Sequence, residues 1–428
     1  MTRPLPPVSR PARRASRRCS IPLALLFFLG PPGAMQAQTF SLKEALDLAA
    51  EKHPLLSAAQ AVVQRAEAGT LTAKAYPNPS ASGQSGRQMV RIPGNVSGYV
   101  QILSFSQPLE LGALRPARLR AAEQSRDVAE VSLEARRLIV LSGVRRAFYG
   151  VLRRQGEMTI LEENLRLVEE MRRRIQVGVE AGETARLELV RADAEVATAR
   201  AQMTGSQIRV IEAMAGFRAA VGTEIPDNVT LRGNLDPQAQ LAPIEELERQ
   251  ALARQPVLRL ARTEVRRSEA QLAFERAQRV PQPSVRVDYE RFPDVPNWRF
   301  GMDIPLPFWN RRQGPIAEAA ALTRQMAAEE QARRVEVLTA LDGAYRRYQA
   351  ASQQLAAFEL GILKEAEAAL NAAQTAFQLG ERGIIDVLDA QRVLRSVRQD
   401  YLNAQYDRQA ALVDLDELRA IDPRGLAQ

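Results

Sequence analysis

Apolar residues recur at alternating spacings of three and four along the C-terminal part of the chain. The positions that carry this pattern are Val387, Ala390, Leu394, Val397, Tyr401, Ala404, Arg408, Ala411, Leu415 and Leu418. Only Arg408 interrupts the apolar seam. Residues three and four apart share a helix face, and a seam of about four heptads is typical of a coiled coil. The pattern predicts a long helix that packs against another helix, rather than an ordinary amphipathic surface helix.

A period of two replaces the helical period over residues 283–308. Val285, Val287 and Tyr289 alternate with charged residues, and the alternation resumes after a Pro-Asp-Val-Pro-Asn turn. The apolar positions of the second run are Trp298, Phe300, Met302 and Ile304. Such alternation predicts a β-hairpin with one apolar and one charged face. A weaker copy spans residues 79–110, and its apolar side carries Tyr99, Leu103 and Phe105 with Gln101 as an interruption.

Two halves of the chain resemble each other in order and spacing. KHPLLSAAQAVVQRAEA at 52–68 resembles RQPVLRLARTEVRRSEA at 254–270, and SQPLELG at 106–112 resembles DIPLPFW at 303–309. The offsets stay close to roughly 200 residues, which random similarity would not maintain. We therefore interpret the chain as two tandem copies of one plan.

Each copy has the same internal order. Repeat one occupies residues 38–221, repeat two occupies residues 244–428, and a connector rich in Gly, Pro, Asn and Asp joins them over 222–243. A first helix precedes the β-hairpin, and a long helix, a glycine break and a returning helix follow it. The helices are predicted at 41–75, 114–177 and 184–221 in repeat one and at 244–279, 314–379 and 384–420 in repeat two, so each repeat ends in a long helical hairpin, 114–221 or 314–420. At 1.5 Å per residue, the long helices reach about 90–100 Å, which no compact core needs.

The N-terminal segment has the parts of a secretory signal peptide. Residues 1–37 contain six arginines and no acid, an apolar stretch IPLALLFFLG and the small-residue stretch GAMQAQ, with predicted cleavage after Ala37. Without those six arginines the formal net charge of +8 falls to +2, so charge gives no reason to expect nucleic-acid binding. Cys19, the single cysteine, precedes the apolar stretch, so we expect neither lipidation nor a disulfide. No later run of about 18 apolar residues predicts a transmembrane helix.

Two hairpins supply four strands per chain. In a soluble protein the apolar sheet face could pack against a helix, but such strands in an exported chain also suit an outer-membrane barrel. Because the smallest membrane barrels have about eight strands and leave little room for a pore, several chains must contribute to one barrel. The predicted fold class is therefore mainly α with membrane β. Long coiled-coil helices accompany four strands per chain, and three chains would give a shared, trimeric 12-stranded β-barrel.

The segment QLGERGIIDVLDAQ, residues 378–391, places two carboxylates directly after a glycine break. Asp386 and Asp389 are spaced i, i+3 and share a helix face. A catalytic pair lacks support, because no nucleophile accompanies them and the single histidine, His53, lies far away in sequence. A metal site of two carboxylates would be weak and suited to hard cations. As acids in a first helical turn, they would stabilise the helix by about 0.3–1 kcal/mol. We predict no catalytic residue, cofactor or metal site, and we expect His53, before Pro54, to begin a helix.

The repeats and these motifs resemble the TolC-like outer membrane efflux proteins. GERGIIDVLDAQ is similar to the periplasmic helical tip of that family, and YPNPSAS with LSFSQPLELG resembles its heavy-metal, cobalt–zinc–cadmium branch. The resemblance implies a homotrimer with its barrel in outer membrane lipid and a helical tunnel in the periplasm. It also implies a periplasmic adaptor and an inner-membrane pump of the resistance–nodulation–division type as partners. The expected function is a passive conduit that exports small molecules or heavy-metal cations, with no nucleic-acid partner.

The resemblance also implies roles for particular residues. It places Asp386 and Asp389 at the periplasmic mouth of the tunnel, where three chains would form two stacked carboxylate rings that gate it. Arg382 matches a tip arginine that ties the closed state together in the family. The tip glycines, which are expected to make tight turns and to contact the adaptor, are Gly178, Gly182, Gly380 and Gly383.

The first repeat departs from the second at its tip. Glu188 and Arg191 take the places of the two acids and are spaced to pair with each other, so only the second tip is expected to supply acidic rings. Spacings of three and four continue from the acids along a mostly acidic stripe. Its members are Val393, Ser396, Asp400, Asn403, Asp407, Ala410, Asp414 and Glu417. We hypothesise that Asp400, Asp407 and Asp414 line the tunnel; the alternative is a solvated coiled-coil flank.

Two other classes of protein compete with a channel. A periplasmic adaptor or another soluble exported coiled-coil protein would have one helical hairpin flanked by β-rich domains, whereas here the hairpin plan occurs twice. A secreted enzyme would need a constellation of catalytic residues, and none is present. Trp298, Trp309 and Tyr99 suit either an interfacial aromatic belt or ordinary packing.

Overall fold

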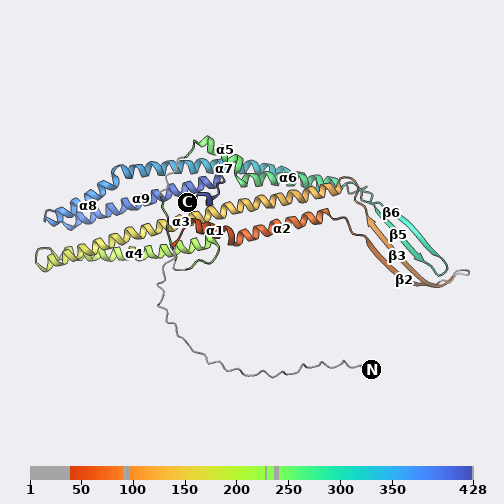
Figure 1. The fold of residues 1–428 in the computed structure, drawn as a ribbon, viewed down its shortest axis with the longest axis horizontal. Coiled ribbons are helices and arrows are strands. Elements are labelled where there is room, and N and C mark those ends of the chain that lie inside the picture. The colour runs from red at the N-terminus through yellow and green to blue at the C-terminus, as the bar shows by residue number, and fades with distance from the viewer. Residues whose placement is uncertain (1–38, 90–93, 95, 227–228, 236–240, 427–428) are drawn as a thin grey trace, which may run out of the picture.

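The computed structural model describes residues 39–89, 94, 96–226, 229–235 and 241–426, so the signal peptide predicted for residues 1–37 lies outside the described part. The described chain is long and narrow (Figure 1). A β-sheet forms one end, two helical hairpins form the other, and paired helices run between them. The helices are α1 (Leu42–Lys52), α2 (Pro54–Lys74), α3 (Leu114–Glu180), α4 (Arg186–Val221), α5 (Ile244–Arg254), α6 (Pro256–Ala277), α7 (Gln313–Ala357), α8 (Leu363–Gln378) and α9 (Ile384–Leu418).

The first helix predicted in each repeat is in fact two helices. The structure divides residues 41–75 at His53, between α1 and α2, and divides residues 244–279 at Gln255, between α5 and α6. His53 and Gln255 each precede a proline. Proline has no N–H and disfavours helical dihedrals in the residue before it, so one helix ends there and another begins with the proline in its first turn. The prediction that His53 begins a helix is confirmed.

The long helix of the second half is also interrupted, whereas that of the first half is continuous. Residues 314–379 were predicted as one helix, but a π-helical segment, Phe358–Ile362, separates α7 from α8, and Gly361 within it has non-helical dihedrals. Phe358 is buried and packs edge-on against Tyr401 of α9, with 6.0 Å between ring centroids. In Figure 1 α8 leaves the line of α7 at this point.

The four-stranded sheet joins the two β-hairpins, as the alternating pattern predicted. Its strands are β2 (Ser80–Gln88), β3 (Gly98–Pro108), β5 (Ser284–Arg291) and β6 (Pro296–Asp303). They are antiparallel in the order β2-β3-β5-β6, which leaves β2 and β6 as edges. The register sets Phe105 opposite Val287 and Tyr289 opposite Trp298. A separate parallel pair, β1 (Thr39–Phe40) and β4 (Thr230–Leu231), ties the start of the described chain to the connector.

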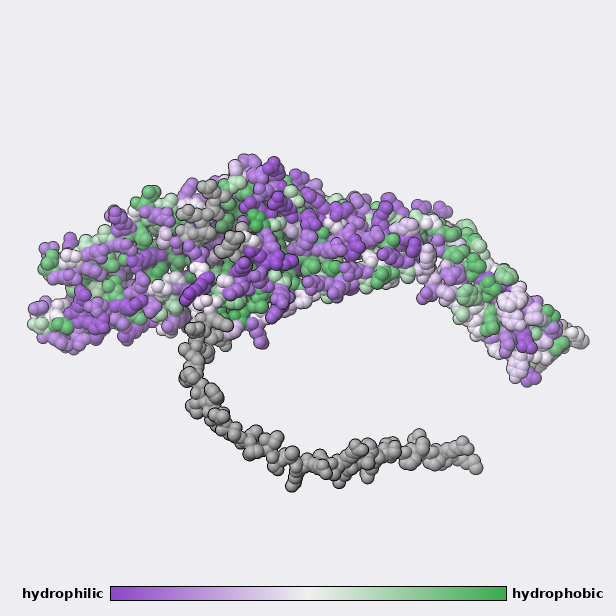
Figure 2. Space-filling view, in the orientation of Figure 1, coloured by the Kyte–Doolittle hydropathy of each residue, from purple (hydrophilic) through white to green (hydrophobic). Residues whose placement is uncertain are grey.

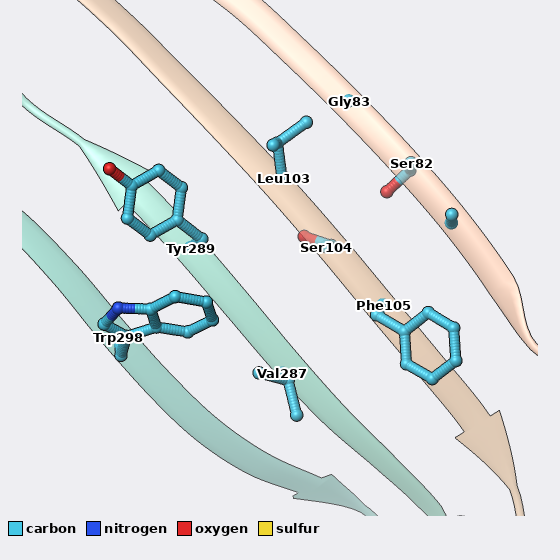
Figure 3. Close-up of a pocket in the computed structure, with 9 residues that line it drawn as sticks. Ser82, Gly83, Leu103, Ser104, Phe105, Val287, Tyr289 and Trp298 are labelled. Atoms are coloured by element: carbon cyan, nitrogen blue, oxygen red, sulfur yellow. The ribbon is translucent and has the colours of Figure 1, made fainter.

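One face of this sheet is apolar and open to solvent in the single chain. Figure 3 shows Leu103, Phe105, Val287, Tyr289 and Trp298 on the same side of their strands. Trp298 is 66% exposed, so none of the described helices covers it. Figure 2 shows hydrophobic side chains along the sheet and its junction with the helices, whereas hydrophilic residues predominate over the helical part. The opposite face carries ion pairs, among them Arg286 with Asp288 at 3.2 Å.

Apolar clusters hold the helices together at separate levels along the rod. Near the middle, Leu46, Phe148 and Phe217 join α1, α3 and α4. The seam predicted on α9 is confirmed, because Val387, Leu394, Ala404, Ala411 and Leu415 are all buried. No helix among the described residues combines the length and the apolar character needed to cross a membrane.

Candidate functional site: the two helical tips

Both tips turn on a glycine in the left-handed conformation. The first lies between α3 and α4 and contains Gly182, with φ of 79°; the second lies between α8 and α9 and contains Gly380, with φ of 74°. In each turn an N–H beyond the glycine donates back to the helix end, from Glu183 to the Gly178 carbonyl oxygen at 2.8 Å and from Glu381 to that of Ala376 at 2.9 Å. This geometry is a glycine C-cap, and a side chain at the left-handed position would be strained.

The remaining two predicted glycines serve different purposes. A Cβ atom at Gly178 would lie 2.5 Å from Oγ1 of Thr184, so this glycine allows the turn to close over the helix end. Gly383 is the residue before α9, with φ of −78° and open space where a Cβ would stand. The two tips therefore share one turn, in which Gly178, Gly182 and Gly380 have steric reasons to be glycine and Gly383 has none.

The second tip carries two exposed carboxylates, each near an arginine of its own chain. Asp386 lies in the first turn of α9, with its Oδ2 3.7 Å from Nη1 of Arg382, and its side chain is 46% exposed. Asp389 is 65% exposed and lies 3.5 Å from Arg392. Exposed pairs of this kind contribute roughly 0–1 kcal/mol, so neither acid is fixed to its arginine. The prediction of two first-turn acids is wrong for Asp389, which lies beyond that turn.

The first tip pairs its charges, as predicted. The guanidinium of Arg191 donates to Glu188 at 3.0 Å, within α4 and directly after the turn. One acid and one base replace the two acids of the second tip at matching places. The two tips therefore have the same backbone turn and different charge.

A row of arginines on α9 joins the two helical hairpins, and we did not predict it from the sequence. Arg392 bonds to Glu195 of α4 at 2.8 Å, and Arg395 donates to Gln202 of α4 at 3.0 Å. Arg398 bridges Glu163 of α3 at 3.0 Å and Glu367 of α8 at 2.9 Å. The arginines recur at every third residue of α9, which is the signal that could have indicated a shared face.

Amide and carboxylate groups deeper in the molecule complete this contact. Between α3 and α9, the buried Gln391 donates to the Asn164 side-chain oxygen at 2.7 Å. Near the middle of the rod, Arg145 of α3 donates to Asp416 of α9 at 2.7 Å, and both side chains are at most 7% exposed. Burial raises the pKa of Asp416, and the neighbouring Arg145 opposes that shift.

The predicted acidic stripe divides into two parts. Asp400 and Asp407 are exposed, as a tunnel-lining role and a solvated flank both require. Asp414 instead accepts from Arg146 of α3 and from Arg347 of α7, each at 3.0 Å. Within the residues that the structure describes, no group of three or more His, Cys, Asp or Glu side chains could hold a metal ion.

An extended helical rod with paired hairpins at one end and an open apolar-faced sheet at the other defines a class of elongated membrane channel subunits. The chain belongs to the outer membrane efflux protein family, whose model matches residues 45–223 and 247–419. The resemblance to TolC-like efflux proteins is thereby confirmed, and an exported channel replaces the adaptor alternative.

Named relatives and a solved structure agree with this assignment. Cobalt-zinc-cadmium resistance protein CzcC of Cupriavidus metallidurans is 27% identical over 384 residues, which cover 89% of this chain and 90% of that protein. Nickel-cobalt-cadmium resistance protein NccC of Alcaligenes xylosoxydans xylosoxydans is 24% identical over 323 residues, or 74% of this chain and 72% of that protein. The crystal structure of CusC matches with a TM-score of 0.74 at 20% identity, over 89% and 92% of the two chains, which shows a common fold.

Proposed function

We propose that this chain is the outer membrane conduit of a tripartite efflux system that exports heavy-metal cations. The similarity to CzcC and NccC, both named for cobalt and cadmium resistance, supports this class of cargo. A periplasmic adaptor and an inner-membrane pump of the resistance–nodulation–division type would supply the energy and choose the cargo. The conduit itself would be passive.

The open sheet supports a homotrimer. Edge strands β2 and β6 present unpaired backbone groups, and the apolar face between them is exposed. In a membrane, backbone groups of this kind need partners, so the edges of one chain pair with those of its neighbours. Three chains would close about twelve strands, with the apolar face toward lipid.

The proposal of a gate at the periplasmic mouth rests on the pair of exposed carboxylates beside the second turn. In a trimer, Asp386 and Asp389 would form two rings of three acids at the periplasmic mouth. Fixed like charges at a constriction attract cations and exclude anions. Arg382, which lies within reach of Asp386, would hold the closed mouth together. Asp400 and Asp407 would extend the acidic surface along the tunnel, while Asp414 is committed to two arginines.

The tips are also the proposed contact with the adaptor. The turns containing Gly178, Gly182, Gly380 and Gly383 form the far end of both hairpins. Exposed apolar side chains accompany each turn, Leu187 at the first and Leu379 at the second. Such residues at the end of a rod offer a hydrophobic contact for another helical hairpin.

Two measurements test this function. Cross-linking in isolated outer membranes should give a trimer on a denaturing gel, and a monomer in the soluble periplasmic fraction would refute the conduit. In cells that keep the pump and adaptor, deletion of this chain should lower resistance to cobalt, zinc or cadmium. The matched control is re-expression of the intact chain, and unchanged metal resistance after deletion would refute the proposed cargo.

A further inference from the structure

The single histidine of the chain closes a junction in the middle of the rod that the proposed gate does not use. His53 separates α1 from α2 and is 7% exposed. Its backbone N–H donates to the Ala49 carbonyl oxygen at 3.1 Å. Its Nδ1 accepts a hydrogen bond from the backbone N–H of Leu55 at 3.1 Å, so the imidazole caps the N-terminus of α2.

The other side of the imidazole lies against the end of α4. Gly222 follows that helix with φ of 72°, and a Cβ atom there would lie 2.5 Å from Cδ2 and 2.7 Å from Nε2 of His53. The backbone of Ala220, near the end of α4, also acts on the imidazole and favours its protonated form. A neutral imidazole has one donor and one acceptor nitrogen, so accepting at Nδ1 leaves the N–H on Nε2, on the side of the ring that lies against the end of α4. One neutral side chain thus joins the start of α2 to the end of α4.

In the second half of the chain an amide occupies the corresponding position, although its side chain does not cap the following helix. Gln255 separates α5 from α6, precedes Pro256 and is 3% exposed. Its backbone N–H donates to the Ala251 carbonyl oxygen at 3.0 Å. Its Nε2 donates to the carbonyl oxygens of Glu417 and Leu418, at the end of α9, at 3.0 and 3.3 Å. Since an amide does not titrate, the chain contains its own pH-insensitive counterpart of His53.

Protonation would turn Nδ1 from an acceptor into a donor that faces the Leu55 N–H. It would also place a positive charge at the positive end of the α2 dipole, inside the protein. Both effects oppose uptake of the proton. Burial lowers the pKa of His53, and the nearby backbone of Ala220 opposes that shift.

Charged side chains on the neighbouring elements do not offset this cost. Glu51 and Lys52 end α1 and are exposed, and Arg65 is the first charged residue on α2. Arg218 and Glu224 flank the glycine that follows α4. Among the described residues, neither of the two acids, Glu51 and Glu224, forms an ion pair with the imidazole.

We propose that His53 is a pH-sensitive clamp, which joins α4 to α2 while neutral and releases that junction when protonated, whereas Gln255 holds the corresponding junction at any pH. Because the folded state favours the neutral imidazole, the junction keeps its full stability above the ordinary pKa of 6.5 and loses stability as pH falls below it. The opening equilibrium should shift by about tenfold for each pH unit between the ordinary and the folded pKa. Acid would therefore loosen the α3/α4 hairpin at its base and spare the α8/α9 hairpin.

Two measurements on the purified full-length protein test the clamp. Because the chain has a single histidine, NMR of ring-labelled protein reports His53 without assignment. We expect an Nε2-protonated neutral imidazole that titrates below 6.5, and titration at or above 6.5 would overturn the proposal. Hydrogen–deuterium exchange, corrected for intrinsic rates from about pH 7.5 to about pH 4, should accelerate at residues 216–226 on acidification and not at residues 412–421.

Exchanging the two side chains supplies matched variants. His53→Gln copies the second half of the chain and should abolish the acid-induced exchange at the end of α4. Gln255→His should create an acid response at the end of α9. Persistence of the acid response in His53→Gln would contradict the clamp, as would no response in Gln255→His. If His53→Gln does not fold, the titration of the native histidine and the acid response of Gln255→His still test the clamp.

Discussion

The two helical hairpins of this chain have the same turn and carry different charges. Each turns on a left-handed glycine with a backbone hydrogen bond back to the helix end, at Gly182 and at Gly380. After the turn, the first hairpin pairs Glu188 with Arg191, whereas the second exposes Asp386 and Asp389. A common scaffold therefore supports two different surfaces, and the acidic chemistry belongs to one tip alone.

The hairpins also differ in how they connect to the sheet. The 67 residues of α3 run unbroken from the sheet to the first tip. The path to the second tip passes through the π-helical segment Phe358–Ile362. Such segments often mark functional positions within helices. The hairpin that carries the exposed acids is thus the one whose helix changes direction before the tip.

Contacts between the hairpins change character along the rod. At the base, Arg145 and Asp416 form a buried ion pair between α3 and α9. Toward the tips, Arg392 and Arg398 bond to the other hairpin from partly exposed positions. Ion pairs that are removed from water are costly to break, and exposed ones contribute little. The base should therefore stay joined under conditions in which the tips separate.

The largest expected effect comes from breaking the buried pair at the base. Arg145→Met would leave Asp416 without its main partner, and we expect the free energy of unfolding to fall by about 3–5 kcal/mol. Denaturant unfolding of the purified protein measures this change. The control is Arg346→Met, which removes an exposed ion pair within α7 and should cost less than about 1 kcal/mol. Equal losses of unfolding free energy in both variants would show that burial does not strengthen the ion pair between Arg145 and Asp416.

A smaller effect, equal at both tips, should follow from altering the shared turn. Valine at Gly182 or at Gly380 would be forced into the left-handed region, at a cost of about 1–3 kcal/mol. Thermal unfolding of the two single variants should give similar losses. Gly383→Ala, at a residue with an ordinary φ and open space, should cost less than about 0.5 kcal/mol. A large difference between the Gly182 and Gly380 variants would refute the equivalence of the turns.

The smallest effect on stability should come from the arginines near the tips. Arg392→Ala and Arg398→Ala should each lower the free energy of unfolding by less than about 1 kcal/mol. Because these side chains join the two hairpins, the double variant should nevertheless raise the open probability in single-channel recordings. Arg333→Ala, which removes an exposed pair within α7, should leave gating unchanged. If the double variant had the same open probability as the native protein, the contacts of Arg392 and Arg398 between the hairpins would not restrain opening.

Local patterns in the sequence predicted local structure well. The spacing of Val387 to Leu415 identified the buried face of α9, and the alternation around Val287 identified the sheet and its apolar face. The glycine turns and the pairing of Glu188 with Arg191 depend on neighbours in the chain, so they too could be predicted.

Features that depend on tertiary contacts escaped prediction. The π-helical segment, which contains Gly361 and where Phe358 packs against Tyr401 of α9, was not predicted. Arg395 donates to Gln202 of α4, and Asp414 accepts from Arg146 of α3. Both partners lie on other helices and far away along the chain. The acidic stripe therefore looked uniform in sequence, although its two ends have different environments. The splits at His53 and Gln255 could have been predicted, since each precedes a proline.

The central claim is that the acidic pair of the second tip gives the conduit its ion selectivity. The most direct test is the reversal potential of single trimers in a lipid bilayer across a potassium chloride gradient. We expect cation preference in the native protein, a shift toward zero for Asp386→Asn with Asp389→Asn, and no shift for Glu188→Gln at the first tip. Anion preference in the native protein, or an unchanged reversal potential in the double variant, would contradict the claim.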